Sequence, residues 1–273
     1  MLKTAFIGLG SQGRPMAERM LAAGFPLTVW ARRPEALASF VDMGAMAAND
    51  IAALAADADH VGICVVDDAG VAQICDALVP EMRPGSLLAI HSTILPESCE
   101  ALATICEARG VAFVDAPVSG GGGAAAAGTL TVMCGGTAAA FEQARLVFES
   151  FAGTLVHLGA SGSGQRAKIV NNSLMAANMG LAHAAMEAGA LLGIAPDALA
   201  ALIKASSGRS FGFEVYARLP APGAFAHGAA LLRKDVDLLQ AILPHAPGTR
   251  SLAAAADPFL IEACSSALVG SQA

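Results

Sequence analysis

The sequence predicts an α/β protein: a doubly wound parallel sheet in the first part of the chain, then an all-helical part, joined by one long helix. Three observations support this fold class. Short apolar runs alternate with helix-length amphipathic segments as far as His157, and a glycine-rich turn follows the first run. After Gly162 the strand signals vanish and only helical spacing remains.

Five short apolar runs are predicted to be buried strands of this sheet: residues 4–8, 27–30, 60–66, 87–90 and 111–114. Their nearly continuous apolar character is typical of parallel strands that helices cover on both faces. Two further strands are expected at 129–133 and 154–157, on either side of a helix at 137–150.

The helical part begins near Gly162. From there one helix is expected to run to about Leu192, a length of about 45 Å. Beyond it, prolines divide the chain into shorter helices: Pro196, Pro220, Pro222, Pro244 and Pro247. We therefore expect a sheet domain over residues 1–161 and an all-helical domain over residues 162–273.

Composition and net charge argue against some classes of binding partner. The chain has 273 residues, is 55% hydrophobic, and carries a net charge of −7 with a pI near 5.3. Binding to nucleic acid or to an anionic membrane is therefore not expected. The longest uncharged stretch, 116–141, is broken by Pro117 and by glycines, so no membrane-spanning helix is predicted. No signal peptide is recognised at the amino terminus, and a cytoplasmic protein is expected.

Cysteine and histidine usage gives no sign of a metal site. The six cysteines form no CxxC pair, as expected of small buried hydrophobes in a reducing compartment. The six histidines are scattered, with no pair four residues apart.

A glycine motif follows the first strand and opens a helix. Its residues are Gly8, Leu9, Gly10, Ser11, Gln12 and Gly13. Glycines at this spacing permit a tight turn, a close backbone approach to a pyrophosphate, and close packing of helix on strand. The motif predicts a Rossmann-type dinucleotide-binding domain. A glycine turn without a ligand is the alternative.

The end of the second strand indicates which dinucleotide is bound. An enzyme for NAD usually has an acidic residue there to bind the ribose hydroxyls. Here Arg32 and Arg33 occupy that position, and two guanidiniums suit a 2′-phosphate. NADP is therefore favoured over NAD, with a solvated surface pair as the alternative.

A second glycine-rich segment runs from Asp115 through Ser119 to Gly123. Beyond Ser119 it exposes successive backbone amides and one hydroxyl, so Ser119, Gly120 and Gly121 could bind a carboxylate. Asp115 is expected to fix the loop. A flexible glycine loop without a ligand is the alternative.

Lys168 and Asn172 lie four residues apart, on one face of the long predicted helix. Partial burial and the nearby positive end of the helix both disfavour a charged amine, which predicts a lowered pKa for Lys168. Such a lysine can exchange a proton with a substrate oxygen.

The chain resembles the β-hydroxyacid dehydrogenase family, which contains 3-hydroxyisobutyrate dehydrogenases and semialdehyde reductases. The resemblance covers nearly the whole chain and rests on five motifs in order: the glycine turn with Met16 and Ala17, the segment 115–121, the segment 128–133, the segment 162–172, and Lys234 with Asp235. It identifies the family more closely than the substrate.

The resemblance implies a role for each matching residue. Lys168 is the proton donor and acceptor, Asn172 orients it, and residues 119–121 bind the substrate carboxylate. Four residues contact the cofactor: Val65, Val66, Thr93 and Lys234. A small carboxylate-bearing substrate and a homodimer or homotetramer are also implied. Asp235 is expected to hold local helix structure, with a polar contact in the cleft as the alternative.

Some features depart from the family pattern. Gln12 replaces the usual methionine of the glycine turn, and Pro244, Pro247 and Pro258 suggest that the last helices are truncated or rearranged. Three alternatives stay open at this point. Imine reductases share the architecture but usually lack the lysine, 6-phosphogluconate dehydrogenases have a larger helical domain, and a non-catalytic NADP-binding protein would bind without turnover.

Overall fold

The computed structural model describes residues 2–270, with side chains as far as residue 265. The chain divides into two compact units, Met1–Lys168 and Ile169–Ala273. This division lies inside a helix, later than the boundary predicted at residue 161, because the first turn of that helix bonds to a strand of the first unit. Within residues 2–270, no helix is long and apolar enough to cross a bilayer.

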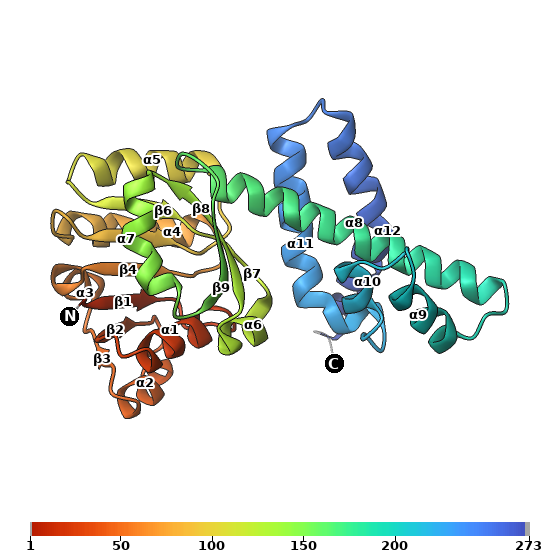
Figure 1. Ribbon diagram of the computed structural model, residues 1–273, viewed down its shortest axis with the longest axis horizontal. Helices are drawn as coiled ribbons and strands as arrows, with labels where there is room; N and C mark the ends of the chain where they lie inside the picture. Colours follow the sequence, from red (N-terminus) through yellow and green to blue (C-terminus); the bar gives the residue numbers. More distant parts are fainter. Residues whose placement is uncertain (1, 271–273) are drawn as a thin grey trace. The chain divides into compact units, whose positions relative to one another are not determined.

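The first unit is built on a nine-stranded sheet with helices on both faces (Figure 1). In spatial order the strands are β3 (Met46–Ala47), β2 (Leu27–Trp30), β1 (Thr4–Ile7), β4 (His60–Ile63), β5 (Leu87–Ile90), β6 (Ala112–Asp115), β8 (Leu130–Gly136) and β7 (Val118–Ser119), and β9 (Ala152–His157) also pairs with β8. The strands from β3 to β6 pair in parallel, which confirms the predicted doubly wound sheet. β8 runs antiparallel to β6 and to β7.

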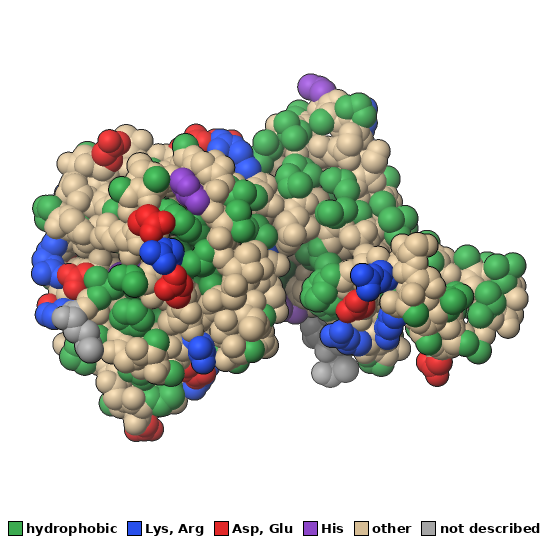
Figure 2. Space-filling model, viewed as in Figure 1, with side chains coloured by type: hydrophobic (Ala, Val, Ile, Leu, Met, Phe, Trp, Pro, Cys, Tyr) green, Lys and Arg blue, Asp and Glu red, His purple; other side chains and the backbone are tan. Residues whose placement is uncertain are grey.

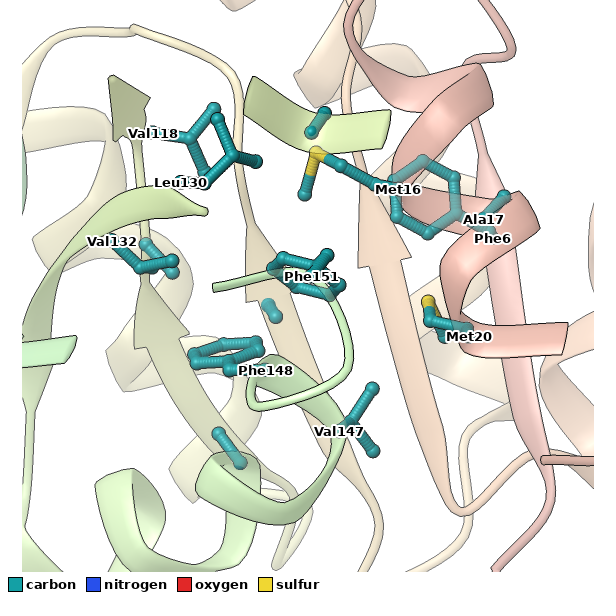
Figure 3. Packing of buried hydrophobic residues seen from close by; sticks show 14 of the residues in the cluster. Phe6, Met16, Ala17, Met20, Val118, Leu130, Val132, Val147, Phe148 and Phe151 are labelled. Atoms are coloured by element: carbon teal, nitrogen blue, oxygen red, sulfur yellow. The ribbon is translucent and has the colours of Figure 1, made fainter. Parts of the chain in front are cut away.

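Alternate residues of each strand enter opposite core layers, as the period of two requires. Phe6 belongs to one core layer with Met16 and Met20 of α1 (Gly13–Ala22) and with Phe148 and Phe151, which come from α7 (Ala138–Phe148) and the turn after it (Figure 3). The next residue, Ile7, packs on the other face. That face is covered by α3 (Ile51–Asp57), α4 (Asp68–Leu78) and α5 (Pro96–Glu107). The remaining short helices of this unit are η1 (Pro34–Ala36), α2 (Ala38–Asp42), η2 (Val79–Glu81) and α6 (Gly121–Ala127).

The strand ends differ from the predicted ones in a way that matters for the site. β4 ends at Ile63, so the predicted strand residues 64–66 form a connection at the carboxyl edge of the sheet. The two-residue strands β3 and β7 were not predicted, because two residues give no readable alternation.

The second unit is helical, and its first helix enters from the first unit. The elements are α8 (Ser163–Leu191), α9 (Pro196–Ala205), α10 (Phe211–Tyr216), η3 (Pro222–Phe225), α11 (Ala226–Ile242) and α12 (Pro247–Gly270). The long helix predicted to end near Leu192 is thus confirmed as α8. Small residues permit close packing of α8 on α12, since a Cβ on Gly180 would lie 1.9 Å from the carbonyl oxygen of Ala255.

The prolines of the carboxyl-terminal region do not prevent long helices, since α11 has 17 residues and α12 has 24. Pro247 is the first residue of α12, where its missing N–H is not needed, and Pro258 lies inside this helix. An internal proline removes one helical hydrogen bond. Here the next two residues, Phe259 and Leu260, are both 0% exposed, and their burial in the core of the second unit stabilises the helix across the proline.

Candidate active site

The turn between β1 and α1 provides a cradle for a dinucleotide. A Cβ on Gly8 would lie 2.1 Å from the carbonyl oxygen of Cys64, and one on Gly13 would lie 2.1 Å from the carbonyl oxygen of Gly8. Gly8 also has a φ of +100°, a conformation that favours glycine. A Cβ on Gly10, in contrast, would meet no atom within 4 Å. Packing thus requires two glycines, and the third leaves space in which a pyrophosphate can approach the backbone.

Gln12 adds an available donor to this turn. Its Nε2 is buried, yet it has no hydrogen-bond partner among the described side chains and backbone. A buried amide N–H without a partner is unfavourable by about 1–3 kcal/mol. A phosphate oxygen would satisfy it, so the residues present fit the predicted cofactor. Leu9 packs against the core beneath the turn, and Ser11 is exposed.

The predicted 2′-phosphate site lies directly after β2. Arg32 and Arg33 are both exposed, and neither forms an ion pair with an acidic side chain within residues 2–265. Two guanidiniums without carboxylate partners are available to a phosphate.

Three predicted cofactor contacts follow neighbouring parallel strands. Val65 and Val66 come after β4, and Thr93 comes after β5. The backbone N–H of Val65 donates to Ser92 Oγ at 2.8 Å, which ties the two connections together. The structure therefore brings these residues to the carboxyl edge of the sheet, where ligands bind in open α/β folds.

The segment predicted to bind a carboxylate is more ordered than expected. Ser119 ends β7, and the glycines that follow begin helix α6 instead of forming a flexible loop. Gly120 and Gly121 have φ values of +130° and +72°. A Cβ on Gly122 would lie 2.6 Å from the carbonyl oxygen of Ser11. The predicted substrate segment thus lies directly against the predicted cofactor turn.

Lys168 is half-buried in the second turn of α8. Asp115 holds the beginning of this helix: its Oδ1 accepts from the N–H of Gly162 at 2.7 Å, and its Oδ2 accepts from the N–H of Gln165 at 2.9 Å. Burial raises the pKa of Asp115, and backbone amides, first that of Gly162, oppose this rise. Asp115 therefore anchors α8, whereas the sequence suggested that it fixes the glycine loop.

Asn172 and Lys234 belong to the second unit, where Asp235 connects them. Asn172 Nδ2 donates to Asp235 Oδ2 at 2.6 Å, and Lys234 Nζ lies 3.6 Å from Asp235 Oδ1. Asp235 is 2% exposed. It does more than hold its own helix, because it fixes the side chain of Asn172 from α11. The neighbouring Lys234 in the motif was the only sequence signal for this role.

Gln165 is the functional-site candidate that sequence reasoning missed. It is 0% exposed, and its side-chain amide bonds to the backbone of residues 92 and 94, on both sides of Thr93. Its position three residues before Lys168 on the predicted helix was the available signal.

Metal and thiol chemistry find no support in the described chain. No group of three or more metal-binding side chains lies together in the part of the chain that the structure describes. All six cysteines are free thiols. Burial raises the pKa of Cys64, Cys106 and Cys134 to about 12, so these thiols stay protonated and unreactive at neutral pH.

Two family models cover almost the whole chain. The first, the NAD binding domain of 6-phosphogluconate dehydrogenase, matches residues 3–159. The second, the NAD-binding domain of NADP-dependent 3-hydroxyisobutyrate dehydrogenase, matches residues 162–272.

Individual proteins show the same relationship. The NAD-dependent L-serine dehydrogenase of Pseudomonas aeruginosa is 38% identical over 259 residues, covering 88% of this chain and 85% of that protein. The mitochondrial 3-hydroxyisobutyrate dehydrogenase of Homo sapiens is 35% identical over 249 residues, covering 86% and 74%. A solved structure of Mycobacterium tuberculosis 3-hydroxyisobutyrate dehydrogenase with L-serine has a TM-score of 0.85 at 28% identity, covering 100% of this chain and 99% of that one.

Proposed function

The chain belongs to the β-hydroxyacid dehydrogenase family, and from this we propose that it is an NADP-dependent dehydrogenase of small 3-hydroxy acids. In the reverse direction it would reduce the corresponding semialdehyde carboxylate. One observation supports this reaction above the others: the segment beginning at Ser119 packs through Gly122 on the carbonyl of Ser11 in the cofactor turn. A carboxylate site and a dinucleotide site that touch would hold a small acid beside a nicotinamide.

The residues of the chain divide the remaining work. When bound, the dinucleotide supplies the hydride acceptor or donor, and the protein supplies binding, orientation and a proton. In the oxidation direction, the hydroxyl proton of the substrate passes to Lys168 Nζ as the C–H hydride leaves. In reduction, Lys168 returns the proton to the carbonyl oxygen. Ser119 and the amides of Gly120 and Gly121 bind the carboxylate, and Asn172 orients the lysine one helical turn away.

The substrate class is proposed from shared chemistry. L-serine and 3-hydroxyisobutyrate, the compounds named for the relatives, both carry a primary hydroxyl on the carbon next to the one that bears the carboxylate. The hydroxyl of Ser119 and two backbone amides are uncharged donors that can bind such a carboxylate. Oxidation of the primary hydroxyl yields an aldehyde, so the proposed product is a semialdehyde.

NADP preference is proposed from Arg32 and Arg33, with Lys234 as a further cofactor contact. The L-serine dehydrogenase of Pseudomonas aeruginosa is NAD-dependent by its name, so the preference has to be measured. We expect Arg32→Ala to raise the KM for NADP at least tenfold, roughly the loss of one charge-assisted pair, and to leave the KM for NAD nearly unchanged. Equal use of both cofactors by the parent protein would contradict the proposed phosphate contact.

The reaction itself is tested by turnover. The protein is assayed with NADP(H) and NAD(H) against short 3-hydroxy acids, their semialdehydes and a cyclic imine. We expect Lys168→Ala to lower kcat/KM about 100-fold to 10,000-fold, the usual range for one general acid/base. Lys3→Ala removes only an exposed ion pair with Asp57 and serves as the matched control. Faster turnover of the imine would indicate an imine reductase, and cofactor binding without any turnover would indicate a non-catalytic protein.

A homodimer is proposed from the second unit, with a homotetramer as the alternative. No residue of α9 is buried, although this helix has an apolar side. Leu191 and Leu192 at the end of α8 are 90% and 77% exposed, and Figure 2 shows hydrophobic side chains gathered over this region. Exposed apolar surface of this kind marks association, and a second copy can offer the same surface in return.

Light scattering after size-exclusion chromatography tests this surface. The double variant Leu191→Glu and Leu192→Glu should be monomeric at micromolar concentration. Leu146→Glu, on another exposed leucine that lies on α7 of the first unit, at 62% exposure, is the control and should leave the mass unchanged. An oligomer that survives the double substitution contradicts the proposed interface.

A cytoplasmic location is also proposed. All six thiols are free, and four of them are buried. Such thiols are typical of a reducing compartment.

A further inference from the structure

The beginning of α8 is capped by a distant strand. The first amides of a helix have no partner within the helix and usually bond to a nearby side chain. Here the carboxylate of Asp115, at the end of β6, accepts from the N–H of Gly162 and from that of Gln165, across 47 and 50 residues of sequence. The direction and the register of α8 are thereby set by the sheet.

The side chain of Gln165 makes a second connection to the sheet edge. Its Nε2 donates to the carbonyl oxygen of Ser92 at 2.8 Å, and its Oε1 accepts from the N–H of Ile94 at 3.2 Å. The two bonded peptide groups flank Thr93. A single amide thus uses both its donor and its acceptor to hold the connection after β5.

Ser92 continues this connection to the next strand. Its hydroxyl accepts from the N–H of Val65 at 2.8 Å, and Ser92 itself is 3% exposed. A continuous set of buried hydrogen bonds therefore runs from α8 through Gln165 and Ser92 to Val65. At one end of this set, Lys168 follows Gln165 by one helical turn. At the other end lie the residues proposed to contact the nicotinamide.

The surrounding backbone allows this arrangement little freedom. A Cβ on Gly164 would lie 2.3 Å from the carbonyl oxygen of Met133 and 2.8 Å from Asp115 Oδ2. A Cβ on Gly135 would lie 2.4 Å from Asp115 Oδ1. Glycines on both sides let α8 approach the sheet closely enough for these short bonds to form.

We propose that Gln165 is a positioning residue for the dehydrogenase reaction: it sets the place of Lys168 relative to the connections that carry Thr93 and Val65. The inference rests on the proposed function, because it assumes that Lys168 exchanges the proton. Gln165 touches neither substrate nor cofactor in this role. It acts through the first turn of α8 on one side and the backbone around Thr93 on the other.

A misplaced proton donor affects the chemical step far more than it affects binding. A displacement of about 1 Å can slow a reaction roughly 100-fold. Gln165→Met keeps the length of the side chain and removes both hydrogen bonds. We expect kcat to fall about tenfold to 100-fold, while the Kd for NADPH, measured by fluorescence titration, stays within about threefold because the glycine turn and Arg32 are untouched.

The isotope effect separates positioning from simple destabilisation. With C4-deuterated NADPH, the deuterium effect on kcat should rise in Gln165→Met, because hydride and proton transfer become slower than product release. A loss of folded protein lowers the amplitude of activity without changing this ratio. Ser92→Ala, which breaks only the bond to Val65, should shift kcat and the isotope effect in the same direction by a smaller factor. It also tests the proposal if Gln165→Met does not fold.

Gln143→Met is the matched control. Gln143 also donates through Nε2 to a backbone carbonyl, that of Gly85 at 2.9 Å, but it lies on α7. Its kcat and isotope effect should equal those of the parent. If Lys168→Ala lowers kcat while Gln165→Met and Ser92→Ala keep the parent kcat and isotope effect, the positioning role is wrong and the proposed function stands. If Lys168→Ala itself has no effect, the proposed function fails first.

Discussion

Two buried histidines make the first unit sensitive to acid. His60 and His91 are 2% and 3% exposed, and both rings pack against Phe148 at centroid distances of 5.7 Å and 5.3 Å. Burial lowers the pKa of His60 to about 3 and that of His91 to about 4. His91 Nδ1 lies 2.8 Å from the carbonyl oxygen of Ala116, whereas His60 Nδ1 has no partner within the described chain. We therefore predict a loss of stability between pH 6.5 and pH 4.

The size of the loss follows from the difference between folded and unfolded pKa values. In the unfolded chain each imidazole has a pKa of about 6.5. Below that pH the two imidazoles are protonated in the unfolded state but stay neutral in the folded state until the pH reaches their lower folded pKa. The stability is fully present above pH 6.5 and declines as the pH falls toward the folded pKa. At pH 5 each histidine contributes a loss of about 2 kcal/mol relative to pH 8, or about 4 kcal/mol together. Asp115 acts in the opposite direction, because burial raises its pKa.

The assay uses urea unfolding followed by the fluorescence of Trp30, the one tryptophan of the sequence, which lies in β2 of the first unit. Between pH 6 and pH 5 the two histidines together should remove about 2 kcal/mol of unfolding free energy. His60→Leu has a similar volume and eliminates the unpaired nitrogen, so it should reduce this loss by about half.

His245→Gln is the control, since His245 is exposed, and it should keep the full loss. If His60→Leu showed the same dependence on pH as the parent protein, the assignment of acid sensitivity to buried imidazoles would be refuted.

Four substitutions of glycine test the glycine turn and the packing within each unit. Gly10→Ala should leave the melting temperature unchanged, because its Cβ meets no atom within 4 Å, but should weaken NADPH binding at least tenfold in a fluorescence titration. Gly122→Ala places a Cβ 2.6 Å from the carbonyl oxygen of Ser11, so calorimetry should show a loss of about 1–3 kcal/mol, and Gly123→Ala, with no atom within 4 Å, should show none. Gly180→Ala places a Cβ 1.9 Å from a backbone oxygen of α12 and should destabilise the second unit, measured by circular dichroism, by at least about 2 kcal/mol.

Local patterns were sufficient to predict the sheet and the long helix. The strands β1, β2, β4, β5 and β6 have apolar runs with turn residues between them, and the predicted cofactor residues of the first unit follow β1, β2, β4 and β5. Val65 and Thr93 were assigned to the cofactor by the resemblance to the family, and they lie at one edge because parallel strands end at the same edge of the sheet.

Helix α6 shows where propensity is misleading. Its first residues, Gly121 to Gly123, are poor helix formers, so the sequence predicts a loop. The same glycines let α6 lie directly on the turn that leads into α1, because Gly122 has no Cβ to collide with Ser11. Tertiary packing overrides the local preference, and no pattern within the segment reports such packing.

Gln165 and Asp235 have distant partners that were missed for a different reason. Each is a buried polar residue whose partners lie far away in sequence: Gln165 bonds to residues 71 and 73 positions earlier, and Asp235 bonds to Asn172, 63 positions earlier. A polar residue on a helix is usually solvated, and only the fold reveals that it is buried and satisfied.

Asp115 also changes how Lys168 is understood. The sequence suggested two causes for a lowered lysine pKa, partial burial and the positive end of α8. In the structure a carboxylate binds the first amides of α8, and its negative charge, where present, offsets the positive end that would act on Lys168. The same carboxylate fixes α8 on the sheet. Asp115 therefore weakens the helix field that acts on Lys168 and, at the same time, fixes the position of the Lys168 amine. That is why the bonds of Asp115 and Gln165, more than the dipole, should determine how well Lys168 works.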